Sequence, residues 1–130
     1  MIFVDSSVWI DYINNADTSQ TSLLDSILGN ESIVVGDLVL TEVLQGCSDP
    51  KVVKQVERLF GLAEFVVVGS YRVALEAARN HVTLRTRGVT VRKTIDTLIA
   101  TRCILSNFEL LHNDRDFLPF EEHLGLKCIH

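Results

Sequence analysis

The sequence predicts an α/β protein with a three-layer α/β/α architecture around a central parallel sheet of about five strands, formed as one domain over residues 1–130. Short apolar runs alternate with longer segments in which apolar residues recur every three or four positions, the pattern of strands alternating with helices. The first run, residues 1–4, is apolar throughout, as is typical of a strand buried on both faces of a parallel sheet.

The strands are predicted from short apolar runs that end at polar or turn residues. Besides residues 1–4, these runs are 32–35, 65–68, 108–112 and 126–129. We expect the second and third runs to be buried strands, as the first is. A carboxylate or another polar group follows most of them, and in parallel sheets such groups gather at the edge where ligands bind.

The first three helices are predicted from apolar spacing and from capping residues. Residues 7–14 and 18–28 each have an apolar stripe at helical spacing, and Gly29-Asn30 ends the second. Asp37 is predicted to cap the third helix. Glu42 in that helix lies off its apolar stripe, so it need not face the core.

Three further helices complete the pattern. Asp49 and Pro50 open a helix that Gly61 closes. A long helix is expected from Ser70 to about Arg85, and its buried stripe is predicted to be Tyr71, Ala74, Leu75, Ala78 and Val82. Thr94 is predicted to cap the last helix, with Ile95, Leu98, Ile99 and Cys103 directed inward.

Composition places the chain among soluble globular proteins. Hydrophobic residues make up 47% of it, which speaks against disorder, and no apolar run approaches the ~20 residues that span a bilayer. The N-terminus lacks the features of a signal peptide. Its three cysteines are odd in number and widely spaced, so we interpret them as buried thiols of a cytoplasmic protein.

Positive charge is concentrated in one segment of an acidic protein. The net charge is −5, yet residues 72–102 contain seven basic and two acidic side chains. A basic stretch on an acidic body is compatible with a phosphate backbone lying along one side. A solvated helix face explains the same segment equally well.

Four carboxylates are expected to meet at one edge of the sheet. Asp5 and Asp114 follow predicted strands, and their ends meet if the first strand lies beside the fourth. Asp96 begins the helix that leads into the fourth strand, and Glu42 lies about one turn into the helix after the second. Each carboxylate has a structural explanation of its own, as a helix cap, a turn residue or a solvated side chain. Their joint placement favours a shared site.

Such a cluster needs a cation, because carboxylates a few ångströms apart resist joint ionisation. Mg²⁺ or Mn²⁺ suits oxygen ligands that share coordination with phosphate and water. We therefore expect phosphodiester hydrolysis by a metal-activated water. The sequence has no Walker loop, no GxGxxG and no Gly-x-Ser-x-Gly elbow, and its histidines and cysteines lack zinc-site spacing.

The sequence resembles the PIN-domain ribonucleases, and more narrowly the VapC toxins of bacterial VapBC toxin–antitoxin systems. The matching stretches are residues 2–7, 41–46, 96–100 and 111–117, which agree with the family in order and spacing. The resemblance implies a PIN-like domain and a Mg²⁺- or Mn²⁺-dependent endoribonuclease. It also implies a homodimer that a cognate VapB-type antitoxin neutralises.

The resemblance assigns roles to individual residues. Asp5, Glu42, Asp96 and Asp114 match the family's acidic quartet, and so are the expected catalytic and metal-binding residues. Asp116 matches a less regular acidic position. Ser6 matches a hydroxyl position that helps to orient the first carboxylate. From the basic segment, the expected RNA-binding residues are Arg85, Arg87, Arg92 and Lys93.

Two other functions remain open at this point. A phosphatase could use Asp5 as its nucleophile, although the usual haloacid-type arrangement has a second aspartate where this chain has Ser7. A non-catalytic domain could bind a basic peptide in the acidic groove. A metal-dependent RNase assay separates both from the ribonuclease hypothesis.

Overall fold

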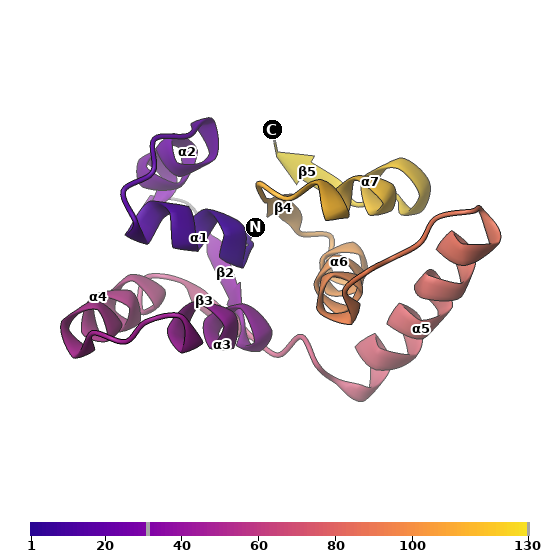
Figure 1. Ribbon diagram of the computed structural model, residues 1–130, viewed down its shortest axis with the longest axis horizontal. Coiled ribbons are helices and arrows are strands. Elements are labelled where there is room, and N and C mark those ends of the chain that lie inside the picture. The colour runs from indigo at the N-terminus through magenta and orange to yellow at the C-terminus, as the bar shows by residue number, and fades with distance from the viewer. Residues whose placement is uncertain (31, 130) are drawn as a thin grey trace.

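The computed structural model describes residues 1–30 and 32–129, and its centre is a parallel sheet (Figure 1). The strands lie in the order β3-β2-β1-β4-β5, and every neighbouring pair is parallel. They are β1 (Ile2–Val4), β2 (Ile33–Gly36), β3 (Glu64–Val66), β4 (Glu109–Leu111) and β5 (Lys127–Ile129). The predicted α/β fold with about five parallel strands is confirmed.

Helices cover both faces of this sheet (Figure 1). The helices are α1 (Ser6–Ile13), α2 (Ser19–Ile27), α3 (Asp37–Gln45), α4 (Pro50–Phe60), α5 (Tyr71–Thr86), α6 (Thr94–Ser106), the 3-10 turn η1 (Arg115–Phe117) and α7 (Leu118–Leu124). Helix α1 packs against α2 and α3, while α5 packs against α6 and α7. No helix in the described part of the chain combines the length and apolarity needed to cross a membrane.

The pairing of β1 with β4 fixes which polar residues meet. Val4 lies opposite Leu111, and the backbone N–H of Asp5 donates to the carbonyl of Leu111 at 3.0 Å. The carboxyl ends of the two strands are therefore adjacent. Asp5 and the loop at residues 112–114 begin at the same edge of the sheet, as expected of a ligand site in an open α/β fold.

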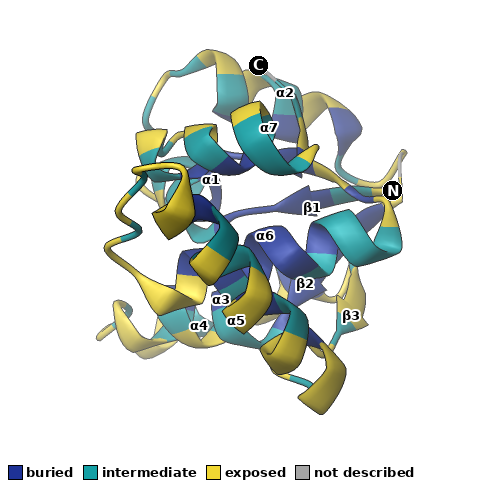
Figure 2. Ribbon diagram, turned by 90° about the vertical axis from the view of Figure 1, so that its right-hand side faces the viewer, coloured by how far each residue is buried: buried dark blue, intermediate teal, exposed yellow. Residues whose placement is uncertain are grey.

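The core beneath this edge is buried, as the dark blue ribbon of the central strands shows (Figure 2). Phe3, Trp9 and Phe117 are fully buried, and the Trp9 ring meets Phe60 edge to face at 4.8 Å between centroids. Gly36 ends β2 where two side chains press on the backbone. A Cβ there would lie 2.6 Å from Val68 Cγ2 and 2.9 Å from Phe3 Cζ, so the position accepts no side chain without repacking.

The prediction that the third strand is buried is wrong. The strand is three residues long and lies at the edge of the sheet, paired with β2. Glu64 and Phe65 are exposed, the latter by 55%. An apolar run identifies a strand but not its place in the sheet, and the place decides how much of it is covered.

The predicted buried stripe of α5 is also wrong. Tyr71 is 82% exposed, and Leu75 and Val82 are exposed too, whereas Val73 and Ala77 are buried. Helix α5 packs on α6 instead of on the sheet, and its outer face is open to solvent (Figure 2). Since α5 is apolar on more than one face, spacing alone did not select the face that α6 covers.

Two helix starts differ from the predicted caps. Gly36 is the N-cap of α3, and Asp37 instead accepts hydrogen bonds from the backbone N–H of Val68 at 2.7 Å and of Leu38 at 3.0 Å. Lys93, not Thr94, is the N-cap of α6 and makes no side-chain capping bond. In α6, Ile99 and Cys103 are buried as predicted, but Ile95 is exposed.

Candidate metal centre

Asp5 directly follows β1 and caps α1 with a carboxylate that is only 3% exposed. Its Oδ2 accepts two hydrogen bonds from Ser7, one from the backbone N–H at 3.0 Å and one from the hydroxyl at 2.6 Å. Burial raises the pKa of Asp5 above its ordinary value, and the bonds from Ser7 act in the opposite direction. The side chain is thus a fixed, buried carboxyl at the strand end.

The Ser7 hydroxyl joins two segments of the chain at this edge. It donates to Asp5 and accepts from the backbone N–H of Asn113, at 3.1 Å, in the loop after β4. Ser6 is the residue expected to help orient the first carboxylate; the hydroxyl that donates to Asp5 in the structure is that of Ser7, while Ser6 contributes a backbone hydrogen bond to Asp5. The side chain of Ser6 is hydrogen-bonded to Glu42, and this bond acts against the rise in the pKa of Glu42.

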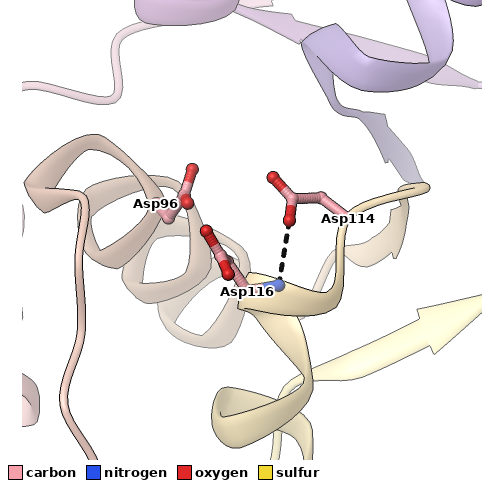
Figure 3. Close-up of side chains that lie close together, drawn as sticks. All are labelled: Asp96, Asp114 and Asp116. Carbon is pink, nitrogen blue, oxygen red and sulfur yellow. Dashed lines mark hydrogen bonds between the residues drawn. The ribbon is translucent and has the colours of Figure 1, made fainter.

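Three further carboxylates, those of Asp96, Asp114 and Asp116, lie close to one another (Figure 3). Asp96 is in the first turn of α6, and Asp114 caps η1, where its Oδ1 accepts the backbone N–H of Asp116 at 2.9 Å. One oxygen each of Asp96, Asp114 and Asp116 lies within 4.8 Å of the others. Figure 3 shows these three side chains directed toward one another from α6, from the loop after β4 and from η1.

Shifts in pKa connect Asp5 and Glu42 with this cluster. Burial raises the pKa of Asp96 to about 6, and the charges of Asp5, Asp114 and Asp116 add to that rise. Burial also raises the pKa of Glu42 in α3, and the next cause is the charge of Asp5. The predicted quartet thus acts as one electrostatic unit, with Asp116 as a close fifth member.

Basic side chains partly neutralise the cluster. The Nζ of Lys93 lies 3.3 Å from Asp114 Oδ2 and 3.6 Å from an oxygen of each of Asp96 and Asp116. Arg92 donates to Asp116 Oδ1 at 2.9 Å. The sequence interpretation missed this pairing, although the three-residue spacing of Lys93 and Asp96 at a helix start was a usable signal.

The other two expected RNA-binding residues lie away from these ion pairs. Arg85 is exposed in the last turn of α5. Arg87 donates to the backbone carbonyl of His123 at 3.0 Å and so helps to hold α7. A cavity of about 190 Å³ next to the carboxylates is lined by a further basic side chain, Arg115, together with Arg92 and Lys93.

The donor set fits a hard divalent cation. Asp96 Oδ2 and Glu42 Oε1 are buried, and neither accepts a hydrogen bond from any residue that the structure describes. A buried carboxylate oxygen without a donor is costly, and a cation coordinated by oxygen removes that cost. Carboxylate oxygens from α3, α6 and two strand ends are the ligand type that Mg²⁺ and Mn²⁺ prefer.

Comparison with known proteins agrees with this geometry. The family model described as PIN domain matches residues 2–121. Ribonuclease VapC11 of Mycobacterium tuberculosis is 28% identical over 119 residues, which are 90% of this chain and 89% of that protein.

Solved structures share the fold at lower identity. VapBC2 from Rickettsia felis, bound to a promoter DNA fragment, has a TM-score of 0.79 at 19% identity and covers 99% of this chain and 98% of its own. VapC20 of Mycobacterium tuberculosis, a toxin that cleaves the sarcin–ricin loop, has a TM-score of 0.64 at 17% identity, and the match covers 91% of this chain and 93% of VapC20.

Asp96→Asn is expected to stabilise the metal-free protein at pH 8. The folded-state pKa of Asp96 is about 6 against an ordinary 3.8, so the folded protein holds this proton more tightly than the unfolded chain does. The group's contribution to stability is therefore complete below pH ~4 and is lost as pH rises through ~6. In EDTA at pH 8, urea denaturation should give the variant a free energy of unfolding higher by roughly 1–3 kcal/mol.

The same measurement at pH 4 provides the internal control. The advantage of the variant should shrink there, because wild-type Asp96 is then largely protonated in the folded state. Asp17→Asn removes an exposed carboxylate outside the cluster and should change stability little at either pH. An Asp96→Asn variant that is less stable than wild type at pH 8 would contradict a strained, ionised Asp96.

Proposed function

The chain belongs to the PIN-domain family, and from that premise we propose that it is a metal-dependent endoribonuclease, the toxin of a type II toxin–antitoxin pair. The observation that carries the proposal is the gathering of Asp96, Asp114 and Asp116, with Asp5 and Glu42 in electrostatic contact, at the carboxyl ends of β1 and β4. The name of the relative VapC11 supports the choice of RNA as substrate.

The proposed catalytic and metal-binding residues are Asp5, Glu42, Asp96 and Asp114, with Asp116 in support. Mg²⁺ or Mn²⁺, when bound, would supply an activated water and stabilise charge on the phosphate. The chain itself contributes the fixed positions of the carboxylates. Ser7 holds Asp5 at the strand end, and Asp96 is buried in the first turn of α6, which keeps its carboxylate from turning to solvent.

Basic groups beside the carboxylates suit the phosphates of a substrate. The 190 Å³ cavity that adjoins Asp96 and Asp116 has Arg92, Lys93 and Arg115 in its wall. A guanidinium group can donate two parallel hydrogen bonds to the oxygens of one phosphate. This cavity can therefore hold the phosphate next to the one whose ester bond is cleaved. We include Arg85 and Arg87 as more distant contacts to the RNA backbone.

Cleavage of RNA should require both the cation and the quartet. We expect excess EDTA to abolish cleavage and added Mg²⁺ or Mn²⁺ to restore it. Asp5→Asn, Glu42→Gln and Asp114→Asn should each lower the cleavage rate at least ~100-fold, because each removes an oxygen charge that the cation needs. The measurement is a time course on labelled RNA with matched protein concentrations.

Asp17→Asn is the matched control, because it makes the same chemical change on an exposed residue outside the cluster, and its cleavage rate should equal that of wild type. Full RNA cleavage in excess EDTA would refute the proposal. Binding of a basic peptide without RNA cleavage in either metal would instead favour a non-catalytic acidic groove. Hydrolysis of small phosphate monoesters that depends on Asp5 would favour a phosphatase.

The contribution of the basic segment can be measured through salt dependence. Arg85→Glu should weaken RNA binding. It should also make the plot of the logarithm of the binding constant against the logarithm of the salt concentration less steep, by about the contribution of one released counterion. Arg58→Glu, an equal charge change on α4, is the control and should leave the slope unchanged. An unchanged slope for Arg85→Glu would indicate that this part of α5 is a solvated face that does not contact RNA.

Two apolar surfaces suit the proposed protein partners. A pocket of about 620 Å³ between α1 and α4, lined by Tyr12, Ile13, Val56 and Leu59, fits an apolar segment of a VapB-type antitoxin whose basic tail reaches the carboxylates. The Rickettsia felis structure bears a VapBC name, which supports such a partner. The open face of α5 fits a second copy of this chain.

The homodimer has a direct test on α5. Wild type should scatter light as a dimer at micromolar concentration, and Leu75→Glu should scatter as a monomer, because it places a charge on the exposed apolar face. Arg72→Glu adds the same negative group to a polar, exposed position of the helix and should leave the dimer intact. A monomeric wild type would refute the dimer.

A further inference from the structure

We propose that Lys93 is a tethered counter-ion that occupies the carboxylate cluster of the metal-free protein and leaves when a divalent cation binds. The inference rests on the proposed metal site and adds to it a residue that sets how tightly the site holds its cation. Lys93 is then a positioning residue that acts on the metal and not on the reacting phosphate.

The position of the ammonium group is the first argument. Lys93 Nζ lies 3.3 Å from Asp114 Oδ2, 3.6 Å from Asp96 Oδ2 and 3.6 Å from Asp116 Oδ2. These are the three carboxylates whose oxygens gather within 4.8 Å of one another. A magnesium ion lies at about 2.0–2.1 Å from its oxygen ligands, so it would need the space that this ammonium fills.

The division of charge around Asp116 is the second argument. Its Oδ1 pairs with Arg92 at 2.9 Å, while its Oδ2 faces Lys93. Arg92 thus lies at the outer edge of the cluster and can remain when a cation enters. Lys93 lies among the oxygens, where its charge repels an entering cation.

The third argument is that the ammonium group of Lys93 can move, whereas the carboxylate of Asp96 cannot. Lys93 precedes α6 in an extended backbone conformation, and its side chain is 56% exposed. A lysine stem is flexible and its ammonium is well hydrated, so the group can turn to solvent at little cost and without altering the helix. Asp96 lies in the first helical turn and is 6% exposed, which keeps its carboxylate in place.

The ammonium also satisfies the cluster incompletely. Its approach to Asp96 Oδ2, at 3.6 Å, is an ion pair without a hydrogen bond, and no described residue donates to that oxygen. A monovalent group therefore lowers the repulsion among the carboxylates but leaves a ligand position for a stronger cation. Removal of Lys93 should have opposite effects on the two states of the protein, which a simple structural role would not produce.

The experiment compares Lys93→Gln with Lys54→Gln, which removes an equal charge from an exposed position of α4. Magnesium binding is measured by titration calorimetry, and thermal melts are recorded in EDTA. For Lys93→Gln we expect the Mg²⁺ dissociation constant to fall roughly tenfold while the melting temperature in EDTA falls. For Lys54→Gln the dissociation constant should stay within about twofold of wild type.

Lys93→Arg keeps the charge and decides the matter if Lys93→Gln fails to fold in EDTA. It should bind Mg²⁺ no more tightly than wild type, and tighter binding would overturn the inference. An unchanged or weaker Mg²⁺ affinity of folded Lys93→Gln would overturn it as well. If wild type binds no Mg²⁺, the proposed metal site fails together with the inference; if wild type binds and Lys93→Gln is unchanged, the inference alone fails.

Discussion

The hydroxyl of Ser7 is the contact on which the arrangement of the site depends. It donates to Asp5 and accepts from the backbone N–H of Asn113, so one atom joins the end of β1 to the loop after β4. The parallel pairing of these strands brings the two chain segments together, and the hydroxyl then fixes the carboxylate between them. Folding thereby holds like charges in proximity, at a cost that the rest of the sheet offsets.

The fold could be predicted from the sequence because the signals for strands and helices are local. Apolar runs and capping residues such as Asp49 identify elements without knowledge of their neighbours. Burial could not be predicted in the same way for β3 or α5. The exposure of Phe65 follows from the place of β3 at the sheet edge, and that of Tyr71 from the packing of α5 on α6.

The same distinction holds at the site. Asp5, Asp96 and Asp114 could be found because each lies next to the end of a predicted strand or at the start of a predicted helix, so topology alone places them together. The choice between Ser6 and Ser7 depends on which hydroxyl points at Asp5 after the first turn of α1, and sequence spacing does not settle that direction. The pairing of Lys93 with Asp96 has a signal in their three-residue spacing, but its contacts with Asp114 and Asp116 depend on how the loop after β4 folds back onto α6.

The order of the sheet has a consequence for the time at which the site exists during synthesis. Strand β1 is made first, yet it lies between β2 and β4, and β4 is made almost at the end of the described chain. A nascent chain that has not yet reached residue 109 has Asp5, Glu42 and Asp96 but nothing to cover one edge of β1. Asp114 follows only after that edge is paired. Assembly of the carboxylates thus requires translation to proceed beyond β4 and Asp114, and a product that stops before β4 cannot assemble them.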